Sequence, residues 1–210
     1  MELYLIRHGE SNWNRIDRVQ GQSDPYLSKK GKEQAEVLAE RLKTVNFSFL
    51  YSSHLKRAYQ TAKAISSKIC LPIKVDQNLS EIDLGEWEGK YAKTLWKENE
   101  VFREWFKKTA EISPPLGETL FQFRDRIDSA FSKLITLHKG EERGVVVTHS
   151  GAISIWLAHL LGMDFNKIWS IPTSNASITI VRFLNPTFLL ASFNDTSHLT
   201  QLWQKSKFQS

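Results

Sequence analysis

Two histidines stand at points where an apolar run gives way to a glycine. His8 follows the run at residues 3–6 and precedes Gly9, and His149 follows the run of valines at residues 145–147. Such junctions are typical of the carboxyl ends of buried strands, which is where open α/β sheets bind their ligands. Arg7 adjoins His8, so a nucleophilic ring nitrogen lies beside a permanently charged guanidinium that can hold phosphate oxygens. This pairing predicts chemistry on a phosphate ester.

Further motifs extend this pattern along nearly the whole chain. They are Arg7-His8-Gly9-Glu10-Ser11 with Asn14, residues 52–62 around Arg57, residues 79–89 around Glu81, Gly117-Glu118-Thr119, and residues 147–151 around His149. Together and in this order they resemble the motifs of the histidine phosphatase superfamily, also called the phosphoglycerate mutase-like family. A lone Arg-His-Gly triplet would be a weak signal, whereas five blocks in family order are specific.

The resemblance implies a role for each matching residue. His8 would attack phosphorus to give a phosphohistidine that water hydrolyses, and Glu81 would protonate the leaving alkoxide. The remaining residues would bind the phosphoryl group, and they are Arg7, Asn14, Gln20, Gly21, Arg57, His149 and Ser150. Arg7, Arg57 and His149 also count as catalytic here, because they would stabilise charge in the transition state.

These roles carry expectations about protonation. The pKa of Glu81 should be raised by its surroundings toward the working pH, since the carboxyl must first give up a proton and later take one back. His8 must be neutral at its attacking nitrogen, and the neighbouring positive groups favour that state.

Strand and helix signals alternate, which favours a three-layer α/β/α sandwich with a mostly parallel central sheet and helices on both faces. Strands are predicted at residues 3–6, 47–51, 73–75, 145–147, 178–183 and 188–193, the last two joined by a turn at Asn185 and Pro186. Helices are predicted after a cap at Ser28, from Arg57 to Ile69, over residues 120–134 and over residues 151–161. Residues 205–210 read as a mobile tail.

A short helical insert at about residues 90–117 is predicted to form a lid. Its aromatic residues Trp96, Phe102, Trp105 and Phe106 fit either a core or a pocket wall, and both interpretations stay open. His198 resembles a position late in several family phosphatases, although a structural role is slightly favoured. His54, His138 and His159 are assigned no function, and Glu88 is expected to be structural.

Composition bounds the class of protein. The 210 residues, 41% of them hydrophobic, suit one domain spanning residues 1–210. The net charge of +5 is spread without a basic block, so a small phosphorylated substrate is favoured over nucleic acid. The single Cys70 and the lack of a leader or a long apolar span favour a cytoplasmic protein with no membrane partner. Strand 188–193 is a candidate edge for a homodimer.

Three functions remain open at this point. A metal-independent phosphomonoesterase leads, because only about 30 residues separate Gly89 from Thr119 and leave little room for the cover that the related mutases carry. A cofactor-dependent phosphoglycerate mutase is the alternative in the same fold, and a non-catalytic module binding a phosphorylated ligand is the alternative in another class. We predict no metal and no other cofactor, since the arginines beside the histidines would repel a cation.

Overall fold

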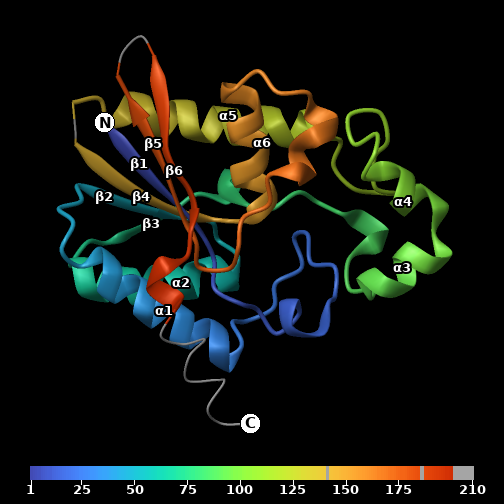
Figure 1. Ribbon diagram of the computed structural model, residues 1–210, viewed down its shortest axis with the longest axis horizontal. Helices are drawn as coiled ribbons and strands as arrows, with labels where there is room; N and C mark the ends of the chain where they lie inside the picture. The colour runs from blue at the N-terminus through green and yellow to red at the C-terminus, as the bar shows by residue number, and fades with distance from the viewer. Residues whose placement is uncertain (141, 185–186, 201–210) are drawn as a thin grey trace.

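One six-stranded sheet organises the chain, and the computed structural model describes residues 1–140, 142–184 and 187–200 around it (Figure 1). The strands are β1 (Glu2–Arg7), β2 (Phe49–Ser52), β3 (Ile73–Val75), β4 (Arg143–Thr148), β5 (Ile178–Phe183) and β6 (Phe188–Asp195). The predicted turn at Asn185 and Pro186 and the predicted tail at 205–210 lie outside the described residues.

The sheet has the order β3-β2-β4-β1-β5-β6. Strands β3, β2, β4 and β1 are parallel to one another, while β5 runs antiparallel to β1 and β6 antiparallel to β5. The prediction of a mostly parallel sheet is therefore confirmed, with an antiparallel hairpin at one edge. Strand β6 is the edge strand, and its pairing with a second copy of the chain stays a prediction.

Helices cover both faces of the sheet, as predicted. The α-helices of the described residues are α1 (Lys29–Leu42), α2 (Lys56–Ile69), α3 (Ala92–Glu98), α4 (Glu100–Trp105), α5 (Leu120–Leu137) and α6 (Ser150–Leu160). Figure 1 shows α1 and α2 below the sheet and α5 and α6 above it. Successive residues of one strand point to opposite faces, so β4 sends Val146 to the α5–α6 side and Val145 and Val147 to the α1–α2 side. This is why the central strands read as continuous apolar runs.

Two short helices, α3 and α4, lie within the insert predicted at about residues 90–117. Asn99 ends α3 and begins α4, because its side-chain Oδ1 accepts a hydrogen bond of 2.9 Å from the Phe102 amide. Two short helices result, and Figure 1 shows them beside the sheet rather than over either face. Within the described ranges, no helix combines the length and apolar character needed to cross a bilayer.

Candidate active site

The two predicted histidines meet because their strands are neighbours in the sheet. Arg7, the last residue of β1, is the register partner of Thr148, the last residue of β4. The His8 amide continues this pairing with a hydrogen bond of 3.0 Å to the Thr148 carbonyl. His8 and His149 follow directly, and their ring centroids lie 5.1 Å apart with the planes at 61°. Parallel pairing of two strand ends thus brings together residues that are far apart in the sequence.

The tautomer of His8 follows from one hydrogen bond. Its Nδ1 lies 2.7 Å from the Gly9 carbonyl oxygen, which can only accept, so Nδ1 carries the proton. Burial, Arg57 and Arg7 together hold the pKa of His8 well below 6.5. The ring is therefore neutral at physiological pH, and its Nε2 has a free lone pair.

Two arginines flank this ring, and backbone carbonyls orient both of them. Arg7 donates from Nη1 to the Thr173 carbonyl. Arg57, in the first turn of α2, donates to the carbonyls of Ser23 at 2.6 Å and Gly21 at 2.7 Å. Burial lowers the pKa of each guanidinium to about 10, so both stay charged at neutral pH. Two fixed positive charges next to a neutral imidazole suit a phosphate dianion.

The loop that orients Arg57 is itself held by Glu88. One carboxylate oxygen of Glu88 accepts from the Gln22 amide at 2.7 Å, and the other from the Ser23 amide at 2.7 Å and hydroxyl at 2.6 Å. Gly21 has a φ of +51°, and a Cβ there would lie 2.0 Å from Glu88 Oε1. The geometry agrees with the structural role expected for Glu88. It also explains why position 21 is a glycine, since a larger residue would collide with the Glu88 carboxylate.

Glu81 reaches the same cavity from the loop that follows the short 3₁₀ helix Gln77–Leu79. Its two carboxyl oxygens accept from the amides of Ile82 at 3.0 Å and Gly151 at 3.1 Å. Burial raises the pKa of Glu81 and outweighs these bonds and the nearby arginines. The direction matches the expectation for a proton donor. Arg126 fixes the backbone from outside by donating to the Glu81 carbonyl at 3.2 Å.

His149 faces β2, the other strand that pairs with β4. Its Nε2 lies 2.9 Å from the Ser53 hydroxyl, just beyond the end of β2, and burial followed by Arg57 lowers its pKa well below 6.5. Its Nδ1 is buried without a partner among the described residues, as are the Nε atoms of Arg7 and Arg57. Buried polar atoms are rarely left unpaired, so three at one site are consistent with a polar ligand binding there.

Other predicted residues lie nearby in different settings. Gln20 and Gly21 line the cavity. Asn14 forms a turn with Ser11, because the Ser11 amide donates a hydrogen bond of 3.0 Å to Asn14 Oδ1. The Ser150 hydroxyl accepts a hydrogen bond of 3.1 Å from the Thr173 amide. Asn14, His149 and Ser150 are not among the described residues that line the cavity. The phosphate contacts of all the predicted residues stay predictions.

Three supporting residues were missed or left undecided by sequence reasoning. Asn175 donates to the His8 carbonyl at 3.2 Å, and the Ala176 amide donates to the same oxygen at 3.1 Å. His198 lies 3.0 Å from the Ala176 carbonyl and therefore supports the wall behind His8, in agreement with the favoured structural role. No local pattern indicates the role of the segment at 173–176, because its contacts to Arg7 and His8 span more than 160 positions of the sequence.

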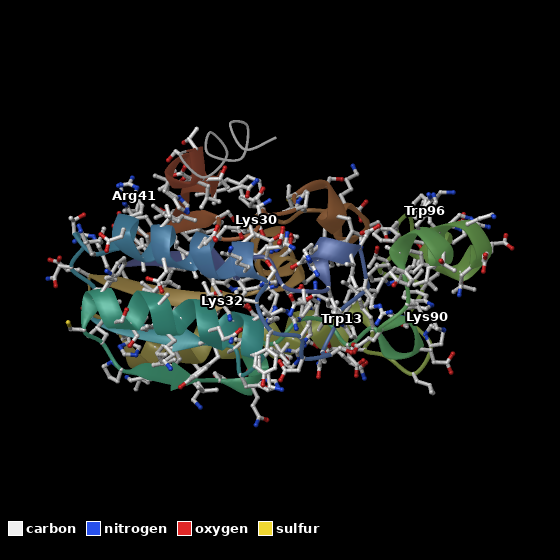
Figure 2. All side chains as sticks on the ribbon, turned by 90° about the horizontal axis from the view of Figure 1, so that it is seen from below. Trp13, Lys30, Lys32, Arg41, Lys90 and Trp96 are labelled. Atoms are coloured by element: carbon white, nitrogen blue, oxygen red, sulfur yellow. The ribbon has the colours of Figure 1, made fainter. Side chains whose placement is uncertain are left out.

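The cavity has a volume of about 230 Å³, and residues of the insert form part of its lining. Phe102, Trp105 and Phe106 from α4 and its end line it, together with Trp169 of the 3₁₀ helix Phe165–Ser170. The predicted aromatic lid therefore has both proposed roles, since Phe102 and Trp105 are also buried core residues. Figure 2 shows Trp96, by contrast, on the outside of the insert, and this side chain is 54% exposed.

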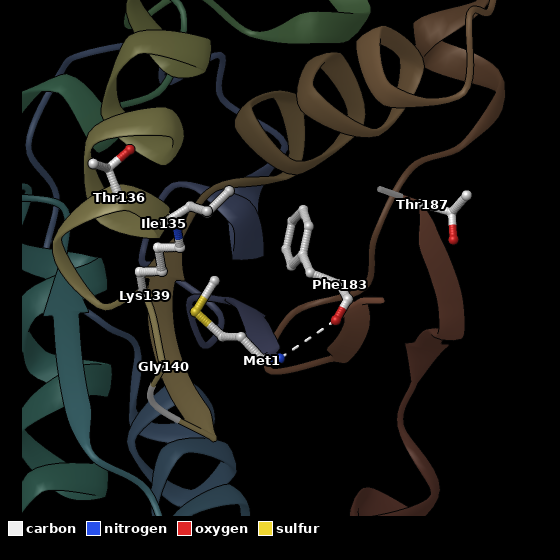
Figure 3. A pocket seen from close by; sticks show the side chains of 7 residues that line it. All are labelled: Met1, Ile135, Thr136, Lys139, Gly140, Phe183 and Thr187. Carbon is white, nitrogen blue, oxygen red and sulfur yellow. Dashed lines mark hydrogen bonds between the residues drawn. The ribbon is translucent and has the colours of Figure 1, made fainter. Parts of the chain in front are cut away.

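A larger cavity of about 490 Å³ lies elsewhere (Figure 3). Met1, Ile135 and Phe183 line it at the start of β1 and the end of α5, the sheet end opposite to His8. Its lining contains no residue of the predicted site among those the structure describes. Volume alone therefore does not locate the chemistry in this protein.

Comparisons with known proteins agree with this geometry. "Phosphoserine phosphatase 1" of Hydrogenobacter thermophilus is 33% identical over 204 residues, covering 97% of this chain and 96% of the relative. "Probable phosphoglycerate mutase GpmB" of Citrobacter koseri is 32% identical, covering 95% of each. The solved structure of Bacillus stearothermophilus YhfR superimposes with a TM-score of 0.88 at 32% identity, covering 94% of this chain and 98% of that one.

The family model matches residues 3–196, which contain every residue of the predicted site. The match confirms the resemblance drawn from the motifs, and it extends from the first residues of β1 to the end of β6. This chain belongs to the histidine phosphatase superfamily, branch 1.

Proposed function

We propose that this protein is a metal-independent phosphomonoesterase that acts on a small phosphorylated metabolite through a phosphohistidine on His8. The observation that carries the proposal is the state of His8: a neutral ring with its lone pair on Nε2, in one cavity with the charged guanidinium groups of Arg7 and Arg57. A phosphatase activity also agrees with the names of several relatives.

In the first step, His8 Nε2 forms a bond to phosphorus while the bond from phosphorus to the ester oxygen breaks. Arg7 and Arg57 neutralise the charge that the phosphoryl oxygens carry during the transfer. The leaving alkoxide takes the proton of the Glu81 carboxyl, which its raised pKa keeps available.

In the second step, the ionised Glu81 accepts a proton from a water molecule. The water oxygen bonds to phosphorus, the bond to Nε2 breaks, and inorganic phosphate leaves. His8 returns to its neutral state with Nδ1 still donating to the Gly9 carbonyl. Covalent catalysis of this kind divides one difficult displacement into two easier ones.

A phosphoglycerate mutase is the second candidate, and the C. koseri relative is the observation that favours it. A mutase would pass the phosphoryl group from His8 to a second substrate hydroxyl instead of water. The two activities therefore share the first step and differ in the acceptor.

The test is phosphate release from a panel of phosphomonoesters in excess chelator, comparing the wild type with His8→Ala and with His54→Ala. His54 is exposed and lies outside the cavity lining, so it provides a matched histidine control. Chelator-resistant release that is lost in His8→Ala and kept in His54→Ala is expected. Loss of activity in chelator would refute metal independence. Conversion of 3-phosphoglycerate without release of phosphate, given a bisphosphorylated primer, would favour the mutase.

A further inference from the structure

The part of the cavity away from the proposed phosphoryl-binding residues is lined mainly by apolar side chains. The charged side chains in the described lining are Arg7, Arg57 and Glu81, and the proposed mechanism uses all three. Gln20 is polar but uncharged, and its Oε1 already accepts 2.7 Å from the Ser11 hydroxyl. The rest of the wall is apolar, chiefly Val19, Leu84, Phe102, Trp105, Phe106 and Trp169.

Ring contacts hold this apolar wall together. Trp105 lies 5.0 Å from Phe106 and 4.9 Å from Trp169, measured between ring centroids. The Trp169 indole donates to the Thr109 hydroxyl at 3.0 Å, and that hydroxyl donates to the Trp105 carbonyl at 2.7 Å. The wall is thus a packed aromatic surface, in which the polar atom of Trp169 is already paired. The buried Trp105 Nε1 has no hydrogen-bond partner among the described residues, and it adds one neutral donor but no charge to this wall.

Such a wall discriminates between substrates by their leaving groups. A carboxylate or an ammonium group, as in phosphoserine or a phosphoglycerate, would lose water there without gaining an ionic partner. An apolar ring would lose only unfavourable hydration, and it would gain edge or face contacts with the aromatic side chains. The volume of about 230 Å³ is below the roughly 300–1,000 Å³ of drug-sized sites, which favours one ring over a nucleotide-sized group.

We infer that the preferred substrates are phosphomonoesters of compact apolar alcohols, with a single aromatic ring or an equivalent aliphatic group, rather than phosphorylated amino or hydroxy acids. The inference rests on the proposed phosphatase function and names the substrate class of the same site. It departs from the substrate named for the H. thermophilus relative.

The first test compares kcat/KM for 2-phenylethyl phosphate and O-phosphoserine. Both are monoesters of primary alcohols, so neither ester has the more reactive leaving group of a phenyl phosphate. We expect a preference of at least tenfold for 2-phenylethyl phosphate. Equal values, or a preference for phosphoserine, would overturn the inference while leaving the phosphatase function intact.

The second test changes the wall. Phe106→Lys places a cation in the cavity lining, and Val101→Lys places the same cation on an exposed position of α4 outside the lining. Phe106→Lys should lower kcat/KM for 2-phenylethyl phosphate at least tenfold and raise it for 3-phosphoglycerate at least threefold. Val101→Lys should change neither by more than twofold. Equal effects of the two variants would refute the assignment of this wall.

A binding measurement separates this inference from the proposed function. Trp105 and Trp169 line the cavity, so ligand binding to the His8→Ala protein should alter tryptophan fluorescence. At least tenfold tighter binding of 2-phenylethyl phosphate than of phosphoserine would support the inference even if the wild type turned over neither ester. If the wild type hydrolysed neither ester in that case, the result would count against the proposed phosphatase function and not against the inferred substrate class. Tighter binding of phosphoserine would overturn the inference.

Discussion

The proposed proton donor, Glu81, is held in place by a glycine, and replacing that glycine tests the geometry directly. Gly151 is the second residue of α6, and its amide donates 3.1 Å to Glu81 Oε2. A Cβ added at Gly151 would lie 2.3 Å from Glu81 Oε1, where ordinary contact begins at 3.4 Å. In Gly151→Ala the carboxyl must therefore move by about 1 Å, a displacement of the size known to impair catalysis.

The expected loss follows from this displacement. A misplacement of about 1 Å costs on the order of 10²-fold in rate, which is about 2.7 kcal/mol of transition-state stabilisation. Stability should change little, because the displaced atom is the end of a flexible side chain and alanine is up to about 1 kcal/mol better than glycine within a helix. Gly151→Ala should thus be a folded protein with a specific defect in proton donation.

The assay compares an alkyl phosphate with 4-nitrophenyl phosphate, whose leaving group needs little protonation. Gly151→Ala should lose about 10²-fold in kcat/KM on 2-phenylethyl phosphate and less than tenfold on 4-nitrophenyl phosphate. In a Glu81→Gln background, which lacks the acidic proton, the same change should add less than threefold, because both substitutions affect one step. Equal losses on both esters, or full additivity with Glu81→Gln, would refute the role given to Glu81.

Two further outcomes follow from the electrostatics of the site. Because burial and Arg57 hold the pKa of His8 well below 6.5, activity on alkyl phosphates should persist as the pH falls through 6.5, and it should decline as the pH rises through the raised pKa of Glu81. A pH profile of kcat/KM in which activity disappears below pH 6.5 would contradict the neutral state of His8. Glu88→Gln should weaken the loop that orients Arg57 and raise KM about tenfold, as expected for an altered charge-assisted contact, whereas the exposed Glu86→Gln should not. Steady-state kinetics on both variants measure this difference, and an unchanged KM in Glu88→Gln would refute the positioning role.

The positions of the proposed phosphoryl-binding residues could be predicted from the sequence because each lies at the start or end of a recognisable element, whereas their proposed roles came from the resemblance to the family. His8 and His149 each follow a run that is buried on both faces, and such runs are recognisable without a structure. Arg57 could be placed for a similar reason, since it lies in the first turn of a helix with a clear apolar stripe. In each case one short segment supplies both the element and the functional residue.

The outer wall of the cavity could not be predicted in the same way. Trp105 and Trp169 meet at 4.9 Å although more than sixty positions separate them, and neither lies in a segment with a diagnostic period. The division of the insert into two helices likewise depends on a single capping bond at Asn99. Such contacts depend on how the finished layers pack, which local periodicity does not contain.

The structure also separates the two halves of substrate recognition. Arg57 donates to the carbonyls of Gly21 and Ser23, which lie outside α4 and its aromatic residues. The aromatic side chains of α4 and its end line the cavity, and the proposed mechanism gives them no part in the transfer itself. Substitutions in α4 should therefore change which ester is accepted while leaving phosphohistidine formation on an ester with a small leaving group nearly unchanged. Changes confined to this short insert would then alter substrate preference in this protein, because the proposed transfer chemistry is built from different residues.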